Sequence, residues 1–116
     1  AQDYGTGLAL DVMAEISEHL LPPGEANERF FRLLTAVLAY LRSSGAAGIW
    51  KAVTYFEWWA VRLSGFLPEL PLSELAAAQQ FEITKTPIGQ IQSGAWDRQA
   101  TAELRRRLGH LIEAHI

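Results

Sequence analysis

Apolar residues recur three or four positions apart along most of the chain, which is the spacing of helices. The first run predicts a helix over residues 8–21 that ends before Pro22, because proline lacks an amide hydrogen and clashes with the preceding turn. A second helix is predicted from an N-cap at Asn27 to about Arg42, and the short linker favours an antiparallel pair. The apolar stripes are Leu8, Val12, Met13, Ile16 and Leu20 in the first helix and Phe30, Phe31, Leu34, Val37, Leu38 and Leu41 in the second.

The third predicted helix covers about residues 47–64 and is the most apolar in the chain. Its wide apolar face indicates a central position in the domain. Gly65 follows and suits the left-handed conformation that often closes a helix. The wide face carries Ile49, Ala52, Val53, Phe56, Trp59, Ala60 and Leu63, with Trp50 and Val61 on a second flank.

The C-terminal half is less regular. Two prolines within residues 66–71 predict a connector, after which Ser73 can cap a short helix through Gln80. Residues 81–94 mix isoleucines with Thr, Pro and Gly, a pattern that fits either a loose hairpin or an ordered loop. A last helix is predicted from about Asp97 to the end, with Ala100, Leu104, Leu108 and Leu111 on its buried side.

These elements predict an all-α fold, a compact bundle of four to five helices with an irregular insertion near residues 81–94. The length of 116 residues suits a single domain over residues 1–116. No apolar stretch approaches the roughly 20 residues that cross a bilayer, so no membrane contact is expected. The chain begins with alanine rather than methionine and shows no signal peptide, so we expect a fragment of a longer protein.

Charge and cysteine content exclude several classes of site. The net charge of −3 gives no broad positive field for nucleic acid, so any DNA contact must be local. The absence of cysteine excludes disulfides, cysteine zinc sites and a cysteine nucleophile, and it fits a cytoplasmic location.

No motif for catalysis stands out. The glycines are scattered and no Gly-x-Ser-x-Gly turn occurs, so we expect no enzyme; a helical hydrolase built on scattered carboxylates is the weakest hypothesis. His110 and His115 are five residues apart, which rotates them by about 140° on a helix. We therefore expect no metal and no cofactor; these histidines, His19, and the carboxylates Glu15 and Glu18 fit solvated helix positions.

A stripe of cations and aromatics follows the third helix. Lys51, Tyr55, Trp58 and Arg62 are spaced 4, 3 and 4 residues apart, opposite the apolar face. Such a stripe suits an acidic, aromatic peptide or a terminal carboxylate, and it also suits base stacking with phosphate contacts. The alternative is that another helix or a further domain covers the two aromatics.

The only dense basic run is Arg105, Arg106 and Arg107 in the last helix. These arginines are candidates for phosphate contacts. They fit equally well the solvated side of an amphipathic helix, with Glu103 and Glu113 nearby.

Residues 56–70 resemble the signature of the RecO family, roughly F-E-L-R-L-L-x-L-L-G-[YF]-x-P-x-L. Residues 15–25 look like the family's E-L-x-x-x-L-L-P-E-G-E segment, and Asn27 with the apolar residues after it continues the match. The resemblance covers about residues 8–70 and then fades. The signature matches are Phe56, Glu57, Leu63, Gly65, Phe66, Pro68 and Leu70.

The resemblance implies the helical domain of a recombination mediator in DNA repair. In the family this domain follows an N-terminal OB-fold, which is absent from these residues and through which single-stranded DNA would mainly bind. The family anneals complementary strands and works with RecR to load RecA onto DNA covered by single-stranded-DNA-binding protein. The acidic, phenylalanine-ended C-terminal tail of that protein docks on the helical domain of the family.

The chain departs from the family at three places. Many members carry a four-cysteine zinc site after the P-x-L segment, but Pro71-Leu72-Ser73-Glu74-Leu75 follows here, so no zinc is expected. Arginines often flank the family's F-E pair, whereas Thr54 and Tyr55 stand here. The sequence also ends about where the family has a basic G-R-x-L-K-S segment, which weakens a DNA-binding prediction for these residues.

Spacing and resemblance together predict a non-catalytic docking domain. Lys51 and Arg62 are expected to pair with the carboxylates of the tail, and Tyr55 and Trp58 to receive its aromatic ring. The alternative is a purely structural helical domain with no ligand of its own.

Overall fold

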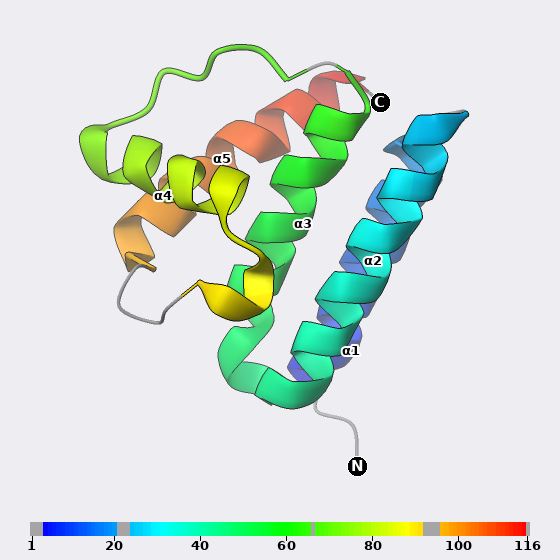
Figure 1. Ribbon diagram of the computed structural model, residues 1–116. Coiled ribbons are helices and arrows are strands. Elements are labelled where there is room, and N and C mark those ends of the chain that lie inside the picture. Colours follow the sequence, from blue (N-terminus) through cyan, green and yellow to red (C-terminus); the bar gives the residue numbers. More distant parts are fainter. Residues whose placement is uncertain (1–3, 21–23, 66, 92–95, 116) are drawn as a thin grey trace.

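A computed structural model describes residues 4–20, 24–65, 67–91 and 96–115 and places them in α-helices, 3₁₀ turns and connectors, with no strand among them (Figure 1). The predicted all-α fold is therefore confirmed. In chain order the elements are α1 (Tyr4–Leu20), α2 (Glu25–Ser44), η1 (Gly45–Gly48), α3 (Ile49–Leu63), α4 (Glu74–Lys85), η2 (Ile88–Gln90) and α5 (Arg98–His115).

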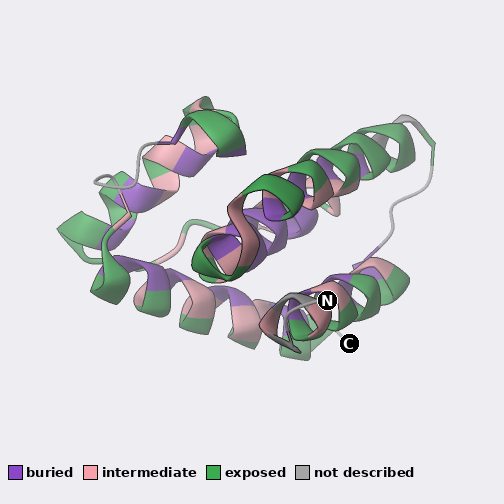
Figure 2. Ribbon diagram, turned by 90° about the horizontal axis from the view of Figure 1, so that it is seen from below, coloured by how far each residue is buried: buried purple, intermediate pink, exposed green. Residues whose placement is uncertain are grey.

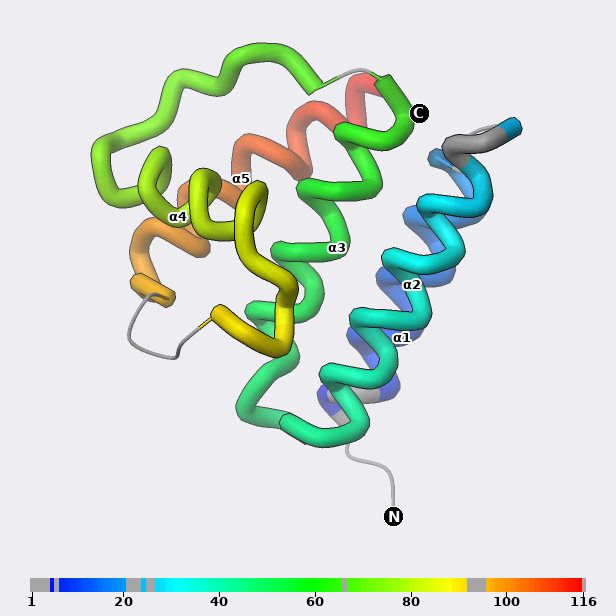
Figure 3. Tube along the Cα trace, in the orientation of Figure 1, coloured from blue at the N-terminus to red at the C-terminus, as the bar shows by residue number. Residues whose placement is uncertain are grey.

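Helix α3 is the centre of the bundle, as its apolar sequence predicts. Helices α1 and α2 run antiparallel and both pack against one side of α3, while α5 packs against another side and carries α4 (Figures 1 and 3). Figure 2 shows the buried residues on the helix faces that are turned toward one another. Every residue of α3 from Ala52 to Trp58 is buried, so this helix is covered around its whole circumference in that stretch.

The contact between α1, α2 and α3 follows the predicted apolar stripes with a few exceptions. Phe30 is fully buried and meets the ring of Phe56 edge-on at 5.7 Å between centroids, a favourable geometry for aromatic pairs. Its neighbour Phe31 is 64% exposed, because successive helical residues are rotated by about 100° and only one can face the core. Leu8 and Val12 of α1 are exposed for the same reason.

The start of α2 differs from the prediction. Gly24, not Asn27, is the N-cap residue, with φ 68° and no side-chain capping bond. Asn27 lies inside the first turn and donates its backbone amide to the Gly24 carbonyl at 3.1 Å. The positive φ, which glycine adopts without a steric cost, lets the helix begin earlier than an asparagine cap would.

A tight corner joins α2 to α3 through η1. Gly45 closes α2 with φ 62°, and Gly48 is buried at the start of α3. A Cβ atom at Gly48 would lie 2.7 Å from both the Tyr40 ring and the Ser44 Cβ, closer than real contacts allow. Only glycine therefore permits this close approach of the two helices.

Helix α4 begins as predicted but ends later. Ser73 is its N-cap and accepts the Ala76 amide at 3.3 Å. The same serine donates its hydroxyl and its backbone amide to the two carboxylate oxygens of Glu103, each at 2.7 Å, which joins α4 to α5. These bonds hold the pKa of Glu103 below its usual range.

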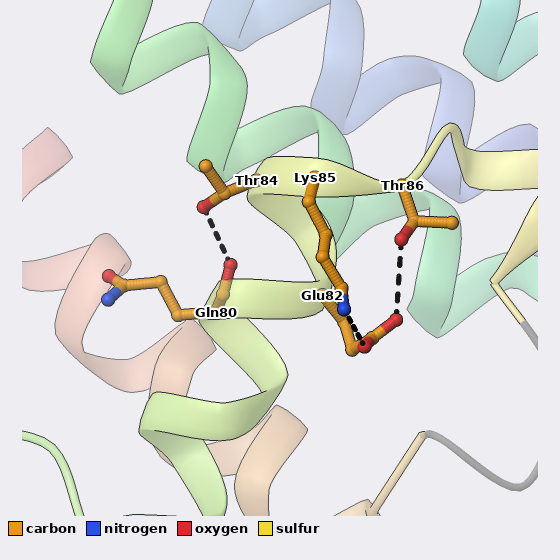
Figure 4. Close-up of polar contacts among 5 residues, drawn as sticks. All are labelled: Gln80, Glu82, Thr84, Lys85 and Thr86. Atoms are coloured by element: carbon orange, nitrogen blue, oxygen red, sulfur yellow. Dashed lines mark hydrogen bonds and ion pairs between the residues drawn. The ribbon is translucent and has the colours of Figure 1, made fainter.

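The predicted irregular insertion is shorter than residues 81–94. Residues 81–85 continue α4, whose last turn carries a Thr84 hydroxyl bond to the Gln80 carbonyl at 2.8 Å and a Lys85–Glu82 ion pair at 3.4 Å (Figure 4). The alternation of Phe81 and Ile83 suggested a strand, but Phe81 is 60% exposed and the buried positions follow helical spacing. Residues 86–91 form a connector with the short turn η2, not a hairpin, and residues 92–95 lie outside the described chain.

The last helix matches its prediction. Asp97 precedes α5, and its carboxylate accepts the Ala100 amide at 2.8 Å. Ala100, Leu104 and Leu108 are buried as expected, whereas Leu111 is half-buried and Ile112 takes the inner position. Among the helices that the structure describes, none has the length and apolar character needed to cross a membrane.

Candidate functional site

The stripe predicted on the third helix does not form one exposed surface. Arg62 is exposed and Lys51 is half-buried, but Tyr55 is only 9% exposed and Trp58 only 3%. The placement of the two aromatics opposite the core is therefore wrong. The physical reason is that α3 is central, so that α5 packs on the side that spacing alone assigned to solvent, and α4 and the 86–91 connector bond to its aromatics.

Three buried or half-buried aromatics of α3 hold α4 and its connector in place. The Trp58 indole donates to the Gln80 side-chain oxygen at 3.1 Å, and the Trp59 indole donates to the Ile83 carbonyl at 3.2 Å. Burial raises the pKa of Tyr55, against the opposing effect of its backbone hydrogen bond with Ile88. Sequence reasoning left open that a helix covers Tyr55 and Trp58, and this alternative describes their burial correctly.

The C-terminal end of α3 opens onto a groove of about 560 Å³, here called the Arg62 groove. Its other walls are the 67–72 connector and the outer side of α4. The Arg62 guanidinium lies over the rings of Trp58 and Trp59, 5.2 and 5.4 Å from their centroids. The lining residues are Trp58, Arg62, Gly65, Leu67, Pro68, Glu69, Leu70, Leu72, Ala77, Gln80 and Thr84.

The Arg62 groove combines an apolar wall with one cation. Leucines, a proline and Trp58 supply the apolar surface, and Glu69 is the one acid among the described lining residues. Arg62 makes no ion pair with any residue that the structure describes. Its guanidinium is held in place by the two indoles and keeps its donors for an incoming carboxylate.

A second groove, of about 430 Å³, lies between the first turns of α3 and the first turns of α5 and is here called the Trp50 groove. Lys51 belongs to it, so the four predicted stripe residues are divided between two sites. The lining residues are Ala47, Trp50, Lys51, Trp96, Arg98, Thr101, Ala102 and Arg105.

The three arginines in the last helix point in different directions. Arg105 faces α3, where its guanidinium lies 4.4 Å above the Trp50 ring and its Nε is 3.5 Å from a Glu57 oxygen. Arg106 is exposed and Arg107 is half-buried. Since successive residues of a helix are rotated by about 100°, the run presents no single basic surface. Their predicted phosphate contacts remain a prediction.

Glu57 is a buried carboxylate at the middle of α3. It is 6% exposed, and burial raises its pKa to about 7, while the positive charge of Arg105 opposes the rise. Glu57 also lines a small cleft of about 270 Å³ with Glu15, His19 and Glu113. Within the part of the chain that the structure describes, no group of three or more His, Asp or Glu residues can hold a metal ion.

Sequence reasoning missed most of the Trp50 groove. Trp50 stood out only as a flank of the third helix, and neither Trp96 nor Arg98 carried a signal. Trp50 is 60% exposed, which is unusual for so large an apolar residue and becomes visible only in the structure. Arg98 is brought to Lys51 by the packing of α5 on α3, which no local pattern encodes.

Comparisons with known proteins agree on one family. The family model described as "Recombination protein O C terminal" matches residues 1–73. A curated relative, DNA repair protein RecO from Koribacter versatilis (strain Ellin345), is 34% identical over 148 residues, which cover 98% of this chain and 59% of the relative. The chain thus spans less than two thirds of that protein, and the matched stretch, longer than 116 residues, includes positions without a counterpart here. No solved structure gives a significant match.

Proposed function

We propose a docking function for this chain, which belongs to the RecO family of DNA repair proteins. Its helical domain is a non-catalytic module that binds the C-terminal tail of single-stranded-DNA-binding protein. That tail is acidic and ends in phenylalanine. The observation that carries the proposal is the Arg62 guanidinium, fixed over two indoles at a groove that also has three leucines and a proline in its lining. The last residue of the tail carries both an aromatic ring and the terminal carboxylate. The ring matches the apolar residues of the groove, and the carboxylate matches Arg62.

The chemistry divides between two parts of the groove. Arg62 can pair with a carboxylate of the tail through charge-assisted hydrogen bonds, which are stronger than neutral ones. The phenylalanine ring can lie against Leu67, Leu70 and Leu72, where its burial is favourable. Trp58 contributes the floor of the groove, and Gln80 holds its indole in position.

The burial of two stripe residues changes their proposed roles. Trp58 supports the ring as part of the wall rather than as an exposed partner, and Tyr55 has no direct contact with the tail because it lies beneath the 86–91 connector. Lys51 lines the other groove, so Arg62 is the principal cation for the tail.

The test is fluorescence anisotropy with a labelled tail peptide and the intact 116-residue chain. Arg62→Glu should weaken binding at least tenfold, about 1.4 kcal/mol, because it turns an attraction for the carboxylate into repulsion. Leu70→Ala should weaken it less, since Leu70 is half-buried and loses only part of an apolar contact. A peptide without its final phenylalanine should bind weakly to every variant.

Arg32→Glu is the matched control, because Arg32 is an exposed cation on α2 and the change in net charge is the same. Equal losses for Arg32→Glu and Arg62→Glu would reduce the binding to general charge attraction. Unchanged affinity in Arg62→Glu would remove the groove as the docking site.

The wider roles implied by the family belong to the same proposal. They are contact with RecR and support of strand annealing, with single-stranded DNA held mainly by an OB-fold that is not among these residues. Supporting this division of labour, the described residues form helices and connectors with no strand among them, and the net charge is −3. Co-purification with RecR, with and without the tail peptide, is the direct test of the first role.

A purely structural domain is the alternative that one observation favours. The indoles of Trp58 and Trp59 and the hydroxyl of Tyr55 are satisfied by hydrogen bonds within the chain, as expected of residues that serve only packing. An unliganded structural domain would bind the tail peptide no better than a scrambled peptide of equal charge.

A further inference from the structure

The Trp50 groove concentrates positive charge in a domain whose net charge is −3. Lys51 on α3 and Arg98 and Arg105 on α5 line it, and no Asp or Glu is among the described lining residues, although the Nε of Arg105 also lies 3.5 Å from an oxygen of the buried Glu57. Asp97 precedes Arg98, but its carboxylate is turned into the start of α5, where it accepts the Ala100 amide at 2.8 Å. The groove is therefore suited to an anionic ligand, and in particular to one with spaced charges, because its cations come from two helices.

The groove also offers indole surface. Trp50 is 60% exposed even though the Arg105 guanidinium covers its ring at 4.4 Å, so much of the remaining ring is open to a ligand. Trp96, half-buried, lines the same groove. Exposed aromatic rings beside cations are the combination on which single-stranded nucleic acids bind, because bases stack on the rings while phosphates meet the cations.

The shape of the lining favours a stacked base over an inserted peptide side chain. Among the described residues that line the Trp50 groove, the aliphatic ones are Ala47 and Ala102, which cannot enclose a leucine or phenylalanine side chain. The Arg62 groove, by contrast, has three leucines and a proline. The Trp50 groove thus offers indole rings and cations rather than an aliphatic pocket, which suits a flat base with neighbouring phosphates.

We infer that the Trp50 groove is a second ligand site of this domain that binds single-stranded DNA, with a base stacked on Trp50 and neighbouring phosphates held by Lys51, Arg98 and Arg105. The inference rests on the DNA-repair role in the proposed function but uses different residues from the tail site. Each of the two sites can therefore fail in experiment while the other stands.

The experiment titrates the 116-residue chain into a labelled short oligothymidylate at low ionic strength and follows anisotropy. Arg98→Glu should weaken binding about tenfold, and Trp50→Ala at least about fivefold, as expected for the loss of a phosphate contact and of a stacked base. The slope of log affinity against log salt should be about −2 for three phosphate contacts on a single strand, and Arg98→Ala should make it shallower by about 0.7.

Two matched controls separate the groove from general effects. Arg32→Glu makes the same charge change on the exposed surface of α2. Phe81→Ala removes another aromatic that is 60% exposed and lies under a cation, since Lys85 is 4.8 Å from its ring centroid, but it lies outside the Trp50 groove. Both variants should change oligonucleotide affinity less than twofold.

Several outcomes would overturn the site. Equal losses in Arg98→Glu and Arg32→Glu would mean diffuse attraction only, and equally tight binding of duplex DNA would remove the stacking role of Trp50. If the chain does not bind the oligonucleotide and Arg98→Glu abolishes binding of the tail peptide instead, the groove is a peptide site. We expect Arg62→Glu to lose affinity for the tail peptide but not for the oligonucleotide. We expect Arg98→Glu to lose affinity for the oligonucleotide but not for the peptide.

Discussion

The two ends of α3 carry a tryptophan in opposite situations, and each governs a groove. Trp58 at the C-terminal side is 3% exposed and bonded to Gln80, so the Arg62 groove is built on the core itself. Trp50 at the N-terminal side is 60% exposed and lies only under Arg105, so the Trp50 groove is built on the surface. One helix can thus present one groove whose tryptophan belongs to the core and another whose tryptophan lies on the surface.

The largest expected effect tests this difference directly. Trp58→Ala should lower the free energy of unfolding by about 3–5 kcal/mol, because it leaves a cavity beneath the Arg62 groove and removes a hydrogen bond to α4. Trp50→Ala should lower it by less than about 1 kcal/mol, since mostly exposed surface is removed. Urea unfolding followed by circular dichroism measures both, and similar losses in the two variants would contradict the comparison.

Glu57 links the core to the Trp50 groove through Arg105 and should make stability depend on pH. Its pKa is raised from 4.5 to about 7 in the folded chain, so between these values the folded state holds more protons than the unfolded one. The free energy of unfolding should therefore fall as pH rises through this window and level off above it.

Glu57→Gln should remove this dependence and be more stable than the parent near pH 8, by about 1–3 kcal/mol. Near pH 4, where both side chains are neutral, the two proteins should have nearly equal stability. Urea unfolding at the two pH values is the measurement. A parent chain that gains stability between pH 4.5 and 7, relative to the variant, would show that Arg105 outweighs burial.

Ser73 should matter to the Arg62 groove alone. Ser73→Ala removes the side-chain cap of α4 and the hydroxyl bond to Glu103, while the backbone amide bond to Glu103 remains, and should cost about 1 kcal/mol. Because α4 is one wall of the Arg62 groove, tail-peptide affinity should fall with it while the Trp50 groove is unaffected. Thermal unfolding and the two anisotropy titrations, made on the same variant, check this.

The smallest effect is expected at Arg106. Arg106→Ala should change the free energy of unfolding by less than about 0.5 kcal/mol, because the side chain is exposed and its attraction to Glu103 is screened by water. Thermal unfolding at low and high salt is sufficient. A loss as large as that of Ser73→Ala would show that the α4–α5 contact depends on the arginine run.

The fold could be read from the sequence because burial in helices follows a period of 3.6 residues. Met13, Phe30, Val37 and Leu104 are all buried where that period places them. The end of α4 could not be read, because Phe81 and Ile83 alternate like a strand and only the tertiary contact of Ile83 decides between the two.

The sites were predictable only in part, for a related reason. Arg62 was found from its spacing, and it lies at a groove. Tyr55 and Trp58 were misplaced because the period assigns a residue to a face but does not say how many faces are covered. That Lys51 and Arg98 line the same groove could not be predicted, because it results from the packing of α5 on α3, which depends on contacts distant in sequence.

The corner at Gly48 has a consequence for binding. Because Gly48 has no side chain, the Tyr40 ring of α2 packs directly on the Gly48 backbone, immediately before α3 begins at Ile49. Trp50 and Lys51 follow within the first turn of α3, so their backbone cannot shift much relative to the bundle. A ligand in that groove meets a wall that is already in its bound position, and little conformational entropy is lost in ordering it.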